Sequence, residues 1–138
     1  MNVLHRIAAL TAIFSLTLLC MGMGDFGDTE IVKKIPRPDR PFTVTIVDDT
    51  DTSFMVSDFS VEGLTLVPVQ MGKANMSIDF AKVKTVTLFE QDSKLAATVV
   101  LNDGSTKQVT MSPRTMFFGR TTWGLMRLKA GDIKAIHF

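Results

Sequence analysis

The sequence is poor in the residues on which much protein chemistry depends. Its 138 residues include one Cys, two His and no Tyr, and Lys+Arg 15 against Asp+Glu 14 leave a net charge of +1. This charge balance argues against a nucleic-acid binder, whose affinity comes mainly from Lys and Arg contacts to phosphates. Intrinsic disorder is also excluded, because 46% of the residues are hydrophobic and disordered chains combine low hydrophobicity with high net charge. The length suits one domain.

The first 24 residues have the pattern of a secretory signal peptide. Arg6 is followed by thirteen uncharged residues, Ile7 to Leu19, and the small residues Gly22 and Gly24 precede the first acid. A basic start, an apolar core and small residues at the cleavage site define such a signal. We therefore expect a signal helix, cleavage after Gly24, and export to the periplasm or cell envelope of a bacterium, or secretion.

The same segment allows two other outcomes. Left uncleaved, Ile7–Gly24 provides eighteen residues, at the short end of the roughly 17–25 that a membrane helix needs. As a lipoprotein, the chain would be cleaved before Cys20 and acylated there, although Leu19 stands where such sites have a small residue. In both cases the contact with the membrane would be made by this segment alone.

Cleavage after residue 24 would remove the only Cys and one of the two His, so that His137 remains. A Cys nucleophile, a CxxC redox pair, a Cys/His zinc site and haem attached through CxxCH are then excluded. We expect no cofactor, and stability must come from packing without a disulfide. Strand alternation places His137 on the face opposite to Ile136 and Phe138, which predicts an exposed histidine.

The mature chain begins with a Pro-rich and basic stretch, residues 25–41, which we expect to be a linker. From Phe42 onward the apolar residues recur with period two, which predicts β-strands and no long helix. Asn102-Asp-Gly104 is the strongest hairpin signal, because these residues tolerate positive φ. Pro68 favours a position at the edge of the sheet. The predicted fold is all-β, an antiparallel β-sandwich or fused small barrels of about ten strands in one domain, residues 42–138.

Two halves of this domain, residues 42–90 and 95–138, can be aligned with each other. An offset of fifty residues pairs Met76 with Met126, and an offset of fifty-four pairs the Asp48 turn with the Asn102 turn. We expect two repeat units that bury their apolar faces together, because one hairpin alone is only marginally stable. The alternative is a chance similarity between two alternating β segments.

The C-terminal sixteen residues carry one further pattern. A Gly after an aromatic residue (Trp123-Gly124) leads into a strand and a turn, and the chain closes with D-I-K-x-I-x-F, residues 132–138. This ending resembles the closing strands of small exported bacterial all-β domains, most of them uncharacterised. The Val83-Lys84-x-Val86 stretch follows the pattern more loosely, with Lys82 where the Asp would stand. The resemblance implies an all-β fold and an envelope location, and it implies no activity.

The acidic residues suggest two kinds of site. Asp48, Asp49 and Asp51 are densely clustered, and oxygen ligands on a turn can hold calcium. Their spacing differs from that of an EF-hand loop, so the alternative is a solvated turn whose side chains cap their own backbone. A hydrolase or carbohydrate-active domain would need two carboxylates across a cleft, and the available acids are Asp58, Glu62, Asp79 and Asp132.

These observations favour a non-catalytic exported domain that binds through its surface. Aromatic side chains and unpaired strand edges are what β proteins commonly use for binding. We expect the partner to be another envelope protein or a second copy of the chain, and no nucleic acid. The expected binding surface is Phe117, Phe118, Arg120 and Trp123, together with the edge near Pro68.

Overall fold

The computed structural model describes residues 29–138. The signal helix, its cleavage after Gly24 and the acylation of Cys20 fall on residues outside this range. No helix within residues 29–138 has the length and apolar character needed to span a membrane. Residues Val32–Phe138 form one compact unit.

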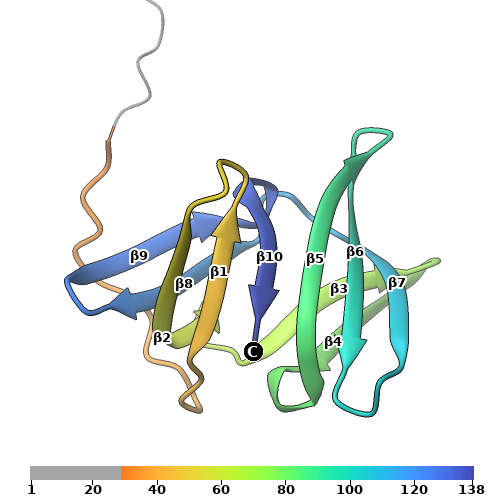
Figure 1. The fold of residues 1–138 in the computed structure, drawn as a ribbon, viewed down its shortest axis with the longest axis horizontal. Coiled ribbons are helices and arrows are strands. Elements are labelled where there is room, and N and C mark those ends of the chain that lie inside the picture. Colours follow the sequence, from red (N-terminus) through yellow and green to blue (C-terminus); the bar gives the residue numbers. More distant parts are fainter. Residues whose placement is uncertain (1–28) are drawn as a thin grey trace, which may run out of the picture. The chain divides into compact units, whose positions relative to one another are not determined.

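The prediction of an all-β fold with about ten strands is confirmed (Figure 1). Neighbouring strands pair in antiparallel fashion, and a single turn of 3-10 helix precedes the last strand of each half. The elements are β1 (Val44–Asp48), β2 (Ser53–Val61), β3 (Leu66–Met71), β4 (Ala74–Asp79), η1 (Phe80–Lys82), β5 (Val83–Gln91), β6 (Lys94–Leu101), β7 (Thr106–Met111), β8 (Met116–Thr121), β9 (Gly124–Lys129), η2 (Ala130–Asp132) and β10 (Ile133–His137).

All ten strands belong to one hydrogen-bonded sheet, with the order β4-β3-β7-β6-β5-β10-β1-β2-β8-β9. The sheet is curled, so that the β8–β9 hairpin lies across the direction of β1 and β10 (Figure 1). The core is therefore enclosed by one curling sheet, and the edge strands are β4 and β9. Pro68 lies on β3, which has β4 beyond it, so the prediction of an edge position for that strand is wrong.

The sheet order shows how the two halves of the chain are joined. Each half runs in the order hairpin, hairpin, 3-10 turn, closing strand. The β3–β4 hairpin of the first half pairs with β7 of the second, and the β8–β9 hairpin of the second half pairs with β2 of the first. Each half thus lends a hairpin to the other, and neither can complete its five-stranded part of the sheet alone.

The alignment of the two halves in the structure differs from the expected alignment in one respect. The pair Val44↔Val56 in the first half matches Ala97↔Val109 in the second, an offset of fifty-three. The expected offset of fifty-four aligned Thr45 with Val99, and therefore an outward side chain with a buried one. A slip of one residue in the alignment reverses the face of the strand to which each side chain belongs. From β3 and β8 onward the offset is fifty, as expected. A duplication as the origin of the two halves stays a prediction.

The core is built from alternate strand residues and a stack of aromatic rings. Leu95, Ala97 and Val99 of β6 are buried, while their neighbours are only partly buried or exposed. The fully buried Phe59 ring is parallel to Phe117, with centroids 5.2 Å apart, and stacks on Phe80 at 5.4 Å. These rings come from both halves, so the same contacts that fill the core hold the two halves together.

Candidate functional site

The expected binding surface is divided by the sheet. Phe117 is fully buried and stacks on Phe59, so it belongs to the core and is not available at the surface. Phe118, the next residue on β8, points to the other face and is half-buried, and Arg120 is on that face too. Trp123, in the turn between β8 and β9, is 86% exposed. Three of the four residues therefore remain on the outer side of this hairpin.

The hairpin is held in a defined shape around Trp123. The Thr121 hydroxyl donates to the carbonyl oxygen of Gly124 (3.1 Å), and the Trp123 backbone N–H is 3.4 Å from the same hydroxyl. Arg120 forms an ion pair with Asp58 of β2 at 3.3 Å. Across the ladder, Arg127 of β9 lies opposite Phe118. The outer face thus combines an aromatic ring, an exposed indole and two guanidinium groups.

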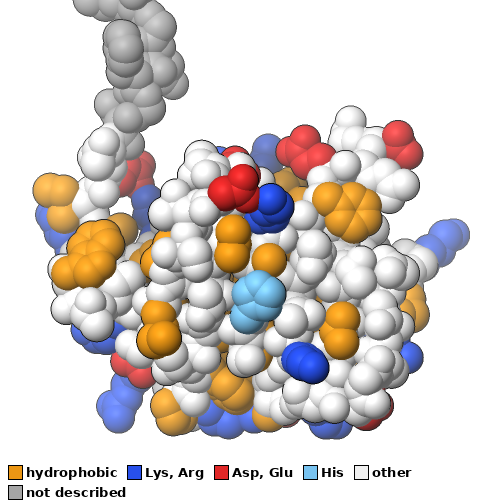
Figure 2. Space-filling model, in the orientation of Figure 1, with side chains coloured by type: hydrophobic (Ala, Val, Ile, Leu, Met, Phe, Trp, Pro, Cys, Tyr) orange, Lys and Arg blue, Asp and Glu red, His pale blue; other side chains and the backbone are white. Residues whose placement is uncertain are grey.

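The β8–β9 hairpin contains basic residues and no acid, although Asp58 of β2 and Asp132 of η2 pair with two of its basic side chains. Its basic residues are Arg120 on β8, and Arg127 and Lys129 on β9. Other exposed hydrophobic residues, such as Met55 and Phe89, are 68% and 45% exposed. Figure 2 shows hydrophobic side chains as separate spots on this face of the molecule. The aromatic and basic character of the β8–β9 hairpin is therefore a local feature.

The Asp48 turn uses its acids in its own structure. The carboxylate of Asp48 accepts hydrogen bonds from the N–H and hydroxyl of Thr50 and from the N–H of Thr52, at 2.9, 2.7 and 2.9 Å. The Thr50 hydroxyl is the main cause that lowers the pKa of Asp48. Asp51 forms an ion pair with Lys134 at 2.6 Å. Within the described part of the chain, no three His, Cys, Asp or Glu side chains are placed to hold a metal ion.

The acids considered for hydrolysis are dispersed over the molecule. Asp58 pairs with Arg120, Asp79 with Arg40 and Asp132 with Lys129, and Glu62 occupies a turn with φ of 53°. A small hollow of about 360 Å³ is lined by two other acids, Asp49 and Glu90, with Lys134 beside them. Asp58, Glu62, Asp79 and Asp132 are not among the residues that line this hollow.

A larger hollow of about 500 Å³ lies between the β3–β4 hairpin and the end of β7. Pro68 and Pro113 line it together with amide, hydroxyl and thioether side chains, and Lys94 is the charged residue on its wall. A proline in a predicted strand was the one sequence signal for this hollow. The strand pairing that places Pro68 near Pro113 could not be predicted from the sequence.

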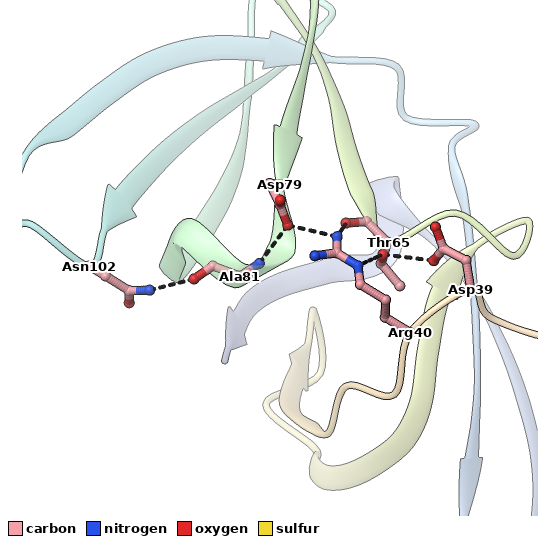
Figure 3. A network of polar contacts seen from close by, with 6 residues as sticks. All are labelled: Asp39, Arg40, Thr65, Asp79, Ala81 and Asn102. Carbon is pink, nitrogen blue, oxygen red and sulfur yellow. Dashed lines mark hydrogen bonds and ion pairs between the residues drawn. The ribbon is translucent and has the colours of Figure 1, made fainter.

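Within the stretch expected to be a linker, Ile35 is buried and Arg40 is bonded to the folded part of the chain. Ile35 is 7% exposed, and Arg40 reaches the end of β4 (Figure 3). Its Nε donates to the Thr65 hydroxyl at 2.9 Å, and one Nη donates to the Asp79 carboxylate at 2.7 Å. The Thr65 hydroxyl in turn donates to Asp39 at 2.8 Å. This network fixes the segment that enters β1.

The electrostatic consequences of this network are mutual. The hydrogen bond from Arg40 is the main cause that lowers the pKa of Asp79, and the same bond raises the pKa of Arg40. The Asp79 carboxylate also accepts from the Ala81 N–H at 2.9 Å, which caps η1. The Asn102 side chain donates to the Ala81 carbonyl at 2.8 Å, which joins the second half of the chain to this network. We interpret this network as structural support.

A protein family model matches most of the chain. The model of a family described as "Uncharacterised protein" matches residues 38–138. No curated protein and no solved structure matches the chain. The matched region begins just before Arg40 and includes every strand of the sheet.

Proposed function

We propose that this chain, which belongs to the family of uncharacterised proteins matched over residues 38–138, is a non-catalytic binding module of the cell envelope. Its binding surface is the outer side of the β8–β9 hairpin, formed by Phe118, Arg120 and Trp123. The observation that carries the proposal is the 86% exposure of Trp123 beside an edge strand.

An indole so exposed is a strong anchor for a partner. Tryptophan and arginine are the residues most enriched among those that dominate binding energy in protein interfaces. The indole also loses little side-chain entropy on binding, because it rotates about two bonds only. The hydrogen bonds of Thr121 hold the turn before any partner arrives, which reduces the ordering cost further.

The edge strand β9 provides the second element of the surface. Strand β9 pairs with β8 on one side and is the last strand of the sheet. The free side of such a strand can pair with an extended segment of another chain. The hairpin contributes three basic side chains and no acid, which favours a partner with an acidic surface.

The partner that fits this proposal is another exported protein, since the signal-like segment of residues 1–24 directs the chain to the envelope. A second copy of the chain is the alternative partner, and the association state distinguishes the two. Membrane contact is proposed only through the N-terminal segment, if that segment is uncleaved or if Cys20 is acylated.

Alanine replacement tests the surface. Trp123→Ala should weaken capture of the partner from envelope extract by about thirtyfold, because an interface anchor contributes about 2 kcal/mol or more. Phe118→Ala should weaken it less, because that ring is half-buried. Met55→Ala is the matched control, as it removes another exposed hydrophobic side chain and should leave capture unchanged.

The result that would refute this surface is a folded Trp123→Ala, Phe118→Ala double variant with the association state and captured proteins of the wild type. Far-ultraviolet circular dichroism and the melting temperature establish folding in each variant. A change from dimer to monomer in the variant would identify a second copy as the partner.

A further inference from the structure

We propose that the hollow between β3 and β7 is a second binding site, which takes an extended peptide segment. It lies on the other hairpin from Trp123, so this proposal does not depend on the β8–β9 surface. The groove is about 500 Å³ in volume.

The groove occupies a place where strand pairing stops. The β8–β9 hairpin of the second half pairs with β2 of the first half at Ser57↔Arg120, Ser60↔Phe118 and Val61↔Phe117. At the equivalent contact, β3 of the first half and β7 of the second pair, within the residues that the structure describes, at Gln70↔Thr110 alone. That pair is the counterpart of Ser57↔Arg120, so the pairing expected next along β3 is missing.

Two prolines explain why the pairing stops. The next pair would be Pro68 opposite Pro113, the counterparts of Phe118 and Ser60, and proline has no N–H to donate. The Thr110 hydroxyl lies 3.3 Å from the Gln70 carbonyl oxygen, so that carbonyl faces β7. Since alternate residues of an antiparallel strand direct their backbone groups to the same side, the Pro68 carbonyl faces the groove as an acceptor.

The two contacts also differ at the residue that corresponds to Gly119. Gly119 on β8 approaches β2 so closely that a Cβ would collide with the Val56 side chain. The corresponding residue on β3 is Val69, which is 6% exposed. Close pairing of β3 with β7 would therefore require a glycine where the chain has a valine. The groove is built into the sequence by Pro68, Val69 and Pro113.

The chemistry of the walls selects the kind of occupant. A gap in a strand ladder is complemented by an extended backbone, which can pair with the strand edge and place alternate side chains in pockets. Gln70 and Asn75 supply amide donors and acceptors, and Met76 and Met111 supply an adaptable apolar surface. Lys94 is the one charged side chain among the described residues of the wall. The occupant is thus a neutral peptide, or one with a single acidic group.

A glycan is the other ligand that hydroxyl and amide groups could bind, but the described wall of the groove lacks the aromatic rings on which a sugar would stack. The described residues that line the groove include no Phe or Trp on which a sugar ring, or a polyproline segment, could stack. The test must therefore compare a peptide with a glycan.

Methyl spectroscopy of methionine provides that comparison. The chain is labelled at its Met methyl groups and titrated with a pool of hexapeptides, acetyl-x-Val-x-Leu-x-Glu-amide, in which x is Ser, Thr or Asn. The pool is used at about 5 mM, enough to load a site with a Kd of roughly 1 mM. The expected result is movement of the Met76 and Met111 signals, with Met55 unchanged as an internal reference. Chitotetraose at the same concentration should move neither.

A blocking variant shows whether the movement comes from the groove. Ser77 is exposed, lines the groove and lies opposite Pro68, so Ser77→Trp should lower the affinity at least tenfold. Thr87→Trp, at an exposed position of β5 that does not line the groove, is the control and should leave the affinity unchanged. The proposal is overturned if the peptide pool moves neither groove methionine, if chitotetraose moves them instead, or if folded Ser77→Trp binds like the wild type.

Discussion

The close contact of β8 with β2 makes Gly119 the most sensitive position in the hairpin that carries Trp123. An added Cβ would collide with the Cγ1 atom of Val56, which is fully buried, and would lie 3.0 Å from the Ser57 carbonyl oxygen. Gly119→Ala should therefore destabilise the protein by about 1–3 kcal/mol, the usual cost of overpacking a core. For a domain of this size the melting temperature falls by roughly 4 °C or more per kcal/mol.

Removal of the opposing side chain tests this explanation. Val56→Ala alone should cost about 2 kcal/mol through lost burial and the resulting cavity. The double variant should be more stable than the sum of the two changes predicts, by about 1 kcal/mol, because Val56→Ala makes room for the new methyl group.

Urea unfolding followed by circular dichroism measures these free energies. Gly124→Ala is the control, since a Cβ there meets nothing within 4 Å, and it should be neutral or slightly stabilising. A Gly119→Ala variant within about 0.5 kcal/mol of the wild type, or a double variant with strictly additive effects, would refute the reasoning.

Three other predictions follow from the described network, the acidic turn and the N-terminal segment. Thr65→Val removes a buried hydroxyl that accepts from Arg40 and donates to Asp39, so it should lower the unfolding free energy by about 1–3 kcal/mol; an unchanged urea midpoint would contradict this. The pKa values of Asp48 and Asp79 lie below 3.8 in the folded chain, so the stability they contribute is present above pH 3.8 and is lost as the pH falls through the lowered values. The double variant with Asn at both positions should therefore show a weaker fall in melting temperature below pH 3.8 than the wild type, and parallel curves would contradict this. The mass of the protein purified from its native host should correspond to a chain that begins with residue 25; a lipid-modified Cys20 or an intact N-terminus would contradict cleavage after residue 24.

Local features of the fold could be predicted because they depend on neighbouring residues. Alternation of apolar and polar residues gave the strands, and Asn102-Asp-Gly104 gave the turn between β6 and β7. His137 is exposed on β10, as alternation required. The same alternation could also have predicted which of Phe117 and Phe118 is buried. Arg120 must face solvent, so Phe118 shares its face and Phe117 must point inward.

Features that depend on distant pairing could not be predicted in this way. The exchange of hairpins between the two halves sets β3 against β7 and β8 against β2, and no local pattern specifies such partners. Arg40 was included in the expected linker because its acceptors, Thr65 and Asp79, are 25 and 39 residues away. The groove has the same origin, because Pro68 and Pro113 become neighbours only through this exchange.

Site-specific photo-cross-linking in the native host tests the proposed binding surface most directly. The full chain is produced with p-benzoylphenylalanine in place of Trp123, or in place of Lys73, the corresponding residue in the turn between β3 and β4. The proposal predicts a cross-link from position 123 to one exported protein or to a second copy of the chain, and none of this product from position 73. Equal cross-linking from the two positions, or none from position 123 in a folded and exported chain, would contradict it.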